Sequence, residues 1–170
     1  MARIGLDVLI PAMAVGAGAT AVMDLWNLLV KLALGIPSLD PCLLGRWISH
    51  MRHGTVRHVS IGAAASQPLE CVLGRIAHYT IGVGLGVVFV ELGPSEWLAR
   101  PTLLPSLVFG IVTVVFPFFI MQPSLGLGVA SAKTRSPAQA RLKSLMSHTA
   151  FGVGLYVCAV AIGAALRTRG

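Results

Sequence analysis

Four long apolar stretches constrain this chain more than any other feature. A helix needs about 20 mostly apolar residues to cross the hydrocarbon core of a bilayer. Residues 4–34, 68–92, 102–122 and 137–166 meet that requirement. Inside lipid only helices and closed barrels satisfy all backbone polar groups. The sequence therefore predicts an all-α, polytopic membrane protein with four transmembrane helices in a single domain over residues 1–170.

Composition excludes a conventional soluble domain. Charged residues make up 11% of the chain and the mean hydropathy is +0.81, whereas a soluble domain carries about 25% charged residues. The net charge of +7 would suit nucleic acid, but the basic residues form no long run and no basic helix face. They lie at the ends of the apolar stretches, where positive charge sets membrane topology. We expect no nucleic-acid partner.

The connections between the spans differ in character. Residues 36–67 form a long loop rich in Arg and His, which we expect to contact anionic lipid. Within it, residues 41–51 carry apolar side chains at i, i+3, i+4 and i+7, which predicts a short amphipathic helix on the membrane surface. The shorter connection 93–101 holds Trp97, a typical interfacial anchor. Pro117 should kink the third span.

The distribution of lysine and arginine predicts the orientation. Nine of the 13 basic residues fall on the side of the first and third connections: Lys31, Arg46, Arg52, Arg57, Arg75, Lys133, Arg135, Arg141 and Lys143. The other four are Arg3, Arg100, Arg167 and Arg169. Cytoplasmic segments carry the excess of positive charge. Both termini are therefore predicted to be periplasmic, and the first and third connections cytoplasmic.

Two segments 70 residues apart are similar. Residues 78–90 (HYTIGVGLGVVFV) and 148–160 (HTAFGVGLYVCAV) are identical at seven of 13 positions, including the histidine and two glycines. A Pro-Ser-Leu sequence also follows the first and the third span. The simplest explanation is a duplicated helix–loop–helix unit, with the two copies related by a pseudo-twofold axis along the membrane normal. Equivalent positions would then face each other across that axis.

Polar side chains inside the spans mark a candidate site. Asp24, His78 and His148 each lie on a stripe of small residues spaced every four positions, which suits close helix packing. An intramembrane charge costs about 2.5–3.5 kcal/mol at a helix centre and should face away from lipid. We therefore expect these three side chains to converge inside the bundle near its cytoplasmic face, with Arg75 close enough to compete for Asp24.

Three interpretations of this site stay open. The histidines would only fix helix packing through hydrogen bonds, or they would form with Asp24 a site for a proton, an ion or a small solute. Alternatively His78 and His148 would ligate a transition metal or a haem. The identity of any cofactor is left open, and the sequence favours the absence of a cofactor over the presence of a haem or a transition metal. It contains no recognised catalytic motif, so it does not favour an enzyme.

The three cysteines, Cys42, Cys71 and Cys158, form no metal-binding or redox motif. Their odd number and irregular spacing argue against a disulfide framework. We expect them to serve as small apolar side chains in or near the membrane.

Several runs resemble a known family. They are ATAVMDLW at 19–26, GIPSLD at 35–40, GRWISHM at 45–51, WLARPTL at 97–103, PFFIMQP at 117–123 and HTAFGVGLY at 148–156. These runs are similar to domain-of-unknown-function family 2938, a group of small bacterial inner-membrane proteins. The resemblance covers nearly the whole chain and implies four spans in a bacterial inner membrane. It implies no activity and no catalytic residue.

The leading functional hypothesis is a small transporter-like or permeation-type protein with a polar intramembrane site. An accessory protein that packs against larger membrane partners is the alternative, and a haem- or metal-binding membrane protein is the second alternative. The bilayer is the one partner that the composition requires. A homo-oligomer or a larger membrane partner is compatible with the sequence.

Overall fold

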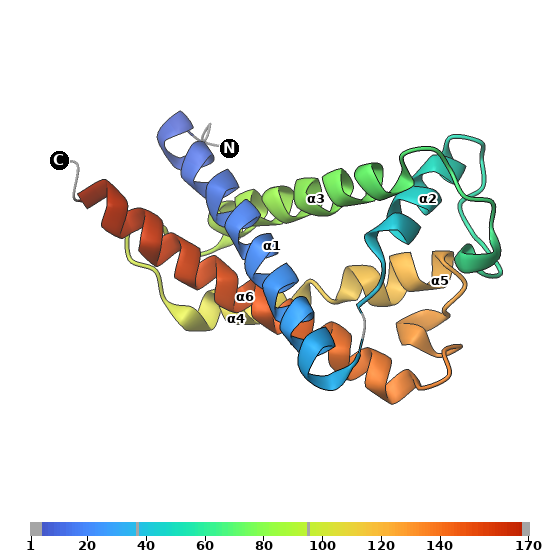
Figure 1. Ribbon diagram of the computed structural model, residues 1–170. Helices are drawn as coiled ribbons and strands as arrows, with labels where there is room; N and C mark the ends of the chain where they lie inside the picture. Colours follow the sequence, from blue (N-terminus) through green and yellow to red (C-terminus); the bar gives the residue numbers. More distant parts are fainter. Residues whose placement is uncertain (1–4, 37, 95, 168–170) are drawn as a thin grey trace.

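The computed structural model describes residues 5–36, 38–94 and 96–167, and these residues form helices and no strand (Figure 1). The α-helices are α1 (Leu6–Leu34), α2 (Pro41–Met51), α3 (Glu70–Leu92), α4 (Leu103–Val112), α5 (Gln122–Ser124) and α6 (Pro137–Arg167). Two 3₁₀ turns, η1 (Ile61–Ala63) and η3 (Val129–Ser131), and a π-helical segment, η2 (Pro117–Met121), complete the chain. The all-helical prediction is confirmed.

Four helical segments are long and apolar enough to cross a membrane: Leu6–Leu34, Glu70–Leu92, Leu103–Ser124 and Pro137–Ala165. Large apolar side chains along their outer surfaces are exposed, for example Leu25, Leu28 and Leu32 on α1. In water such surfaces would be costly, but facing lipid tails they are not. The protein is therefore a membrane protein with four spanning segments.

The third span is interrupted rather than simply kinked. Helix α4 ends at Val112, and Pro117, five residues later, has no N–H to bond the carbonyl of Thr113. The chain continues through η2, where the N–H of Gln122 donates to the carbonyl of Pro117, an i to i+5 bond. The regular helix is thus interrupted in the part of the span where Pro117 predicted a kink, and Thr113 is the residue that directly follows α4.

Glycines set how the spans pack. Helix α1 packs against both α3 and α6, and α6 packs against α4 (Figure 1). A Cβ atom added to Gly86 would lie 2.6 Å from the Cα of Gly16, and one added to Gly152 would lie 2.7 Å from the carbonyl oxygen of Ser106. The backbones approach this closely only because those positions carry no side chain.

The bundle has two unlike ends. The first turn of α1 and the last turn of α6 lie at one end, and α2, η1 and α5 lie at the other, called here the α2 end (Figure 1). Away from the α2 end the core is aromatic, with the Phe89 ring 4.6 Å from that of Trp97 and 4.9 Å from that of Phe109. Trp97, expected as an interfacial anchor, is instead 3% exposed and belongs to this core.

Candidate functional site

A cavity of about 430 Å³ opens at the α2 end. Side chains of α1, α2, α3 and α6 line it together with η2, α5 and the segment around η3. Asp24, His78 and His148 all line this one cavity. Polar lining of this kind is uncommon among apolar spans, where isolated polar groups are costly to bury.

Asp24 and His78 are in direct contact. Nε2 of His78 lies 3.0 Å from Oδ1 of Asp24, and the hydroxyl of Tyr79 donates to Oδ2 at 3.1 Å. Both partners come from the first turns of α3, while Asp24 comes from α1. The carboxylate thus holds one partner on each oxygen, which satisfies its need for donors inside the bundle.

His148 has a different partner. Its Nδ1 lies 2.8 Å from the hydroxyl oxygen of Thr113, and that hydroxyl lies 2.6 Å from the carbonyl oxygen of Gly110. Thr113 has a single hydroxyl proton, and the carbonyl can only accept. If that proton goes to Gly110, Nδ1 of His148 must carry the proton of the second bond, and Nε2 of the neutral ring is an acceptor. The direct Asp24–His78–His148 contact expected from the sequence is therefore limited to its first two members.

Further polar residues of the cavity were not singled out from the sequence. The Ser147 hydroxyl donates to Oδ1 of Asn27 at 2.6 Å, and the Gln122 amide lies 3.3 Å from Ser144 Oγ. Gln122 is only 5% exposed, and its Oε1 is buried without a hydrogen-bond partner in the described part of the chain. Asn27 could have been predicted as a site residue from the sequence, because it follows Asp24 by three residues and therefore shares its helix face.

Arg75 does not line the cavity. It lies instead in an outer recess of α3 with Cys71, Val72, Ile76 and Tyr79. The side chains that hydrogen-bond the Asp24 carboxylate are His78 and Tyr79. The side chain of Tyr79 therefore lies between the recess and the cavity. It lines the recess, and its hydroxyl bonds Asp24, which lines the cavity.

The interpretation of the site as a metal centre lacks a suitable set of ligands among the described residues. Within residues 5–36, 38–94 and 96–167, no group of three or more His, Cys, Asp or Glu side chains is placed to hold a metal ion. His78 is engaged by Asp24 and His148 by Thr113. A site built from these two histidines would have to replace both hydrogen bonds.

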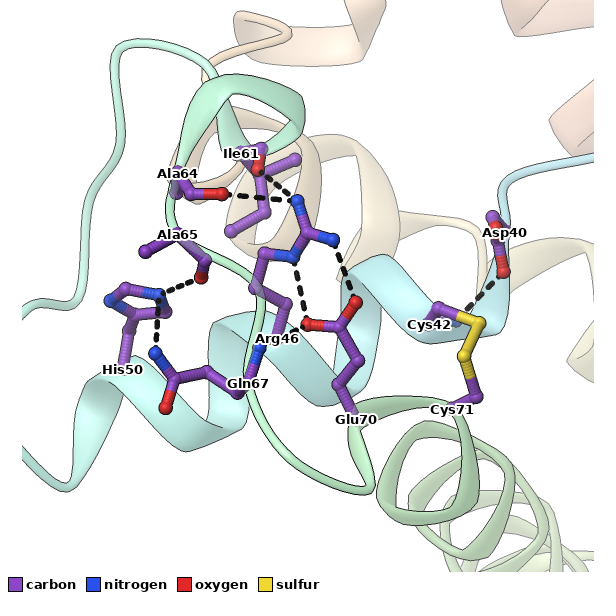
Figure 2. Close-up of polar contacts among 10 residues, drawn as sticks. All are labelled: Asp40, Cys42, Arg46, His50, Ile61, Ala64, Ala65, Gln67, Glu70 and Cys71. Carbon is purple, nitrogen blue, oxygen red and sulfur yellow. Dashed lines mark hydrogen bonds and ion pairs between the residues drawn. A yellow bond between two sulfur atoms is a disulfide. The ribbon is translucent and has the colours of Figure 1, made fainter.

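Helix α2 is fastened to α3 beside the cavity, and here the sequence-based expectation for the cysteines is wrong. Cys42 and Cys71, 29 residues apart, form a disulfide (Figure 2). One turn further along, Gly45 meets the backbone of Glu70 and Gly74, so that each helix approaches the other at a glycine three residues after its cysteine. Spacing along the chain gives no sign of this pairing, because it depends on how two glycines let the helices cross.

An ion pair between Arg46 and Glu70 completes the contact between α2 and α3. We call these three contacts together the clasp: the disulfide Cys42–Cys71, the glycine contact Gly45–Gly74 and the ion pair Arg46–Glu70. The Arg46 guanidinium binds both carboxylate oxygens of Glu70, at 2.6 and 2.9 Å, and also donates to the carbonyls of Ile61 and Ala64 (Figure 2). Its hydrogen bond to Glu70 raises the pKa of Arg46 above its ordinary value. The predicted amphipathic helix 41–51 thus exists as α2, docked on α3.

The loop after α2 also folds back onto the bundle. The N–H of His58 donates to the carbonyl of Ser124 at 2.8 Å, and the N–H of Ile61 donates to the carbonyl of Leu125 at 3.0 Å. The loop is therefore tied to the end of the third span as well as to α2. These bonds place the two basic connections of the chain side by side at the α2 end.

The two halves of the chain repeat one packing contact. Gly82, four residues after His78, packs on Thr20 and Gly16, while Gly152, four residues after His148, packs on Ser106 and Leu107. In each half the histidine bonds a polar side chain of the preceding span. This correspondence supports the duplication inferred from the sequence. The partners differ, being Asp24 in the first half and Thr113 in the second.

Fold and site together define a four-span membrane protein with a polar cavity at one end. The chain belongs to the family described as protein of unknown function (DUF2938), whose model matches residues 13–162. No curated protein and no solved structure matches the chain.

Proposed function

We propose that this protein is a transporter-like membrane protein that binds a small polar solute in the cavity at the α2 end. The observation that carries the proposal is the polar lining of a 430 Å³ space inside four apolar spans. That volume suits a small-molecule ligand. A protein that merely packed against partners would gain nothing from lining a space between its own spans with an acid, two histidines and an amide.

Gln122 and the charged residues indicate the chemistry of the solute. The unpartnered Oε1 of Gln122 is an acceptor that a bound donor would satisfy. The lining carries charges of both signs, because Asp24 and Asp40 are acidic and Lys143 is basic. A solute that carries hydrogen-bond donors and either no net charge or both charges matches this lining, because a single net charge would leave one side chain opposed.

For location we propose the bacterial inner membrane, with the α2 end in the cytoplasm and both termini in the periplasm. Nine of the 13 lysines and arginines support this orientation. The exposed Arg52 and Arg57 in the loop after α2 would then meet the anionic lipid of the cytoplasmic leaflet.

Binding by the purified full-length protein tests the proposal. Amino acids, polyols and nucleobases are added one by one in detergent, and the thermal unfolding midpoint is followed. A solute at 100 times its dissociation constant stabilises the folded state by about 2.7 kcal/mol. We expect one of these classes to raise the midpoint of wild-type protein and of Asp7→Asn, a matched control on the exposed first turn of α1. The same class should not stabilise Asp24→Asn.

Proteoliposomes then separate transport from binding alone. The stabilising solute, radiolabelled, is expected to exchange across the bilayer by counterflow with wild-type protein and with Asp7→Asn. If Asp24→Asn binds and exchanges the solute as well as wild type does, the cavity is not the site.

A further inference from the structure

Both cysteines of the clasp occupy the second position of a helix. Cys42 follows Pro41 at the start of α2, where its N–H donates to Oδ1 of the capping Asp40 at 2.8 Å, and Cys71 follows Glu70 at the start of α3. The positive end of a helix stabilises a thiolate, which is the form that attacks disulfides. The two sulfur atoms therefore lie where thiol–disulfide exchange is favoured.

Cys71 can be reached from outside. It is exposed and lies in the outer recess of α3 together with Arg75. A partly exposed cysteine near a cation is the typical environment of a reactive one, whereas structural disulfides of stable domains are usually buried. Because Cys71 is the second residue of the span Glu70–Leu92, it lies at the end of that span, where a small reductant or oxidant from the water phase can reach this bond.

Helix α2 contributes one wall of the cavity. Asp40, Pro41 and Leu44 line it, and Cys42 lies between them in the same turn. The disulfide thus holds the wall itself against α3. Without the covalent bond, the first turn of α2 would be held by non-covalent contacts alone, among them the glycine contact and, one turn further on, the Arg46–Glu70 ion pair.

We propose that Cys42 and Cys71 form a thiol–disulfide switch that locks α2 over the cavity when oxidised and lets it open when reduced. The proposal rests on the proposed solute cavity and on the cytoplasmic position of the α2 end. In a reducing cytoplasm a disulfide is usually transient and redox-sensing rather than permanent. The bond described in Figure 2 is then the oxidised, closed state of the protein.

The chemistry balances as a two-electron exchange. The thiolate of Cys71 attacks the disulfide of an oxidised low-molecular-weight thiol of the glutathione class, forming a mixed disulfide and releasing one thiol. The thiolate of Cys42 then displaces the second thiol and joins its sulfur to that of Cys71. Two protein thiols are oxidised and one small disulfide is reduced to two thiols. A dithiol reductant drives the reverse reaction.

Access to a cysteine inside the cavity tests the switch without any solute. All variants carry Cys158→Ala, and Ser144→Cys places the reporter thiol on the cavity lining. Membranes with the full-length protein are treated with a small cationic methanethiosulfonate, which does not react with the clasp disulfide. We expect Ser144→Cys to react about tenfold faster when Cys42→Ser and Cys71→Ser remove the bond. Thr55→Cys, exposed on the loop after α2, should react at the same rate in both backgrounds.

Equal rates at Ser144→Cys in the two backgrounds would overturn the proposal. Protein that retains both clasp cysteines provides a second comparison if the serine pair does not fold. Its Ser144→Cys labelling is measured before and after reduction by a water-soluble phosphine, with the label located by peptide mass spectrometry. The same tenfold acceleration is expected on reduction.

The redox state in growing cells gives an independent check. Cells are quenched in acid and free thiols are tagged with a maleimide that adds mass. We expect Cys42 and Cys71 to be tagged in unstressed cells and protected after treatment with diamide. A pair that stays protected in unstressed cells is a permanent structural bond, and the switch is then wrong even if the cavity binds its solute.

Discussion

His78 and His148 stand at equivalent positions of the repeat but bond unlike partners. His78 contacts a carboxylate, so its protonation would create an ion pair with Asp24. His148 contacts a hydroxyl that is itself tied to a backbone carbonyl. The sequence predicted both histidines as site residues, but not this difference, because no spacing pattern along the chain pairs Thr113 with His148.

Asp24→Asn should separate stability from binding. The Asp24 side chain is 45% exposed and that of His78 is 29% exposed, so loss of the charge should change the free energy of unfolding by about 1 kcal/mol or less. Solute affinity should fall at least about tenfold, which corresponds to about 1.4 kcal/mol. Thermal unfolding and solute titration of the variant measure the two quantities. A large loss of stability with intact binding would mean that Asp24 serves the fold.

Two glycines of α3 that lie two residues apart allow a matched test of how much helix packing contributes to stability. A methyl group at Gly86 would press on Gly16, with 2.6 Å to its Cα, whereas one at Gly84 meets nothing within 4 Å. Gly86→Ala should cost about 1–3 kcal/mol through overpacking and lower Tm by several degrees. Gly84→Ala should keep or slightly raise Tm, since alanine favours the helix by about 1 kcal/mol. Equal Tm values would show that α1 and α3 can move apart freely.

At the scale of elements, periodicity and length were sufficient for the spans and for α2. Residues 41–51, predicted as an amphipathic helix, are the residues that α2 occupies. What that pattern could not reveal is the surface against which the helix packs. Gly45 and Gly74 determine the crossing with α3, and the Cys42–Cys71 bond follows from that crossing. Such contacts between distant segments leave no periodic signal in either of them.

Pro117 shapes one side of the cavity, and its replacement tests this role. In Pro117→Ala the new N–H can donate to the carbonyl of Thr113, so α4 should continue into η2 and protect residues 113–121 from amide exchange. The change should draw Thr113 away from His148 and weaken solute binding. Hydrogen-exchange mass spectrometry and solute titration measure these effects.

Pro11→Ala is the control for this experiment, because Pro11 lies inside α1, in its first half, and does not line the cavity. It should leave exchange over 113–121 and solute binding unchanged. If Pro117→Ala behaves as this control does, the interruption has another cause, such as the hydroxyl of Thr113 bonding Gly110.

For the whole molecule, orientation can be measured directly. With nine of 13 basic residues at the α2 end, alkaline phosphatase fused after residue 170 should be active, and a green fluorescent protein at that place should stay dark. Fusions at residue 55, in the loop after α2, should give the opposite result. A fluorescent fusion at the C-terminus would reverse the orientation and place the disulfide in the oxidising periplasm.

The aromatic core around Phe89, Trp97 and Phe109 fills the bundle away from the α2 end, so that the cavity is open at the α2 end and closed towards the opposite end. Met23, which lines the cavity, also packs against the cluster that contains Phe89 and Trp97. Interlocked rings cannot yield by small adjustments, because a packed core changes between discrete arrangements. Passage across the bilayer would therefore require a second shape of the bundle in which Phe89 and Trp97 part.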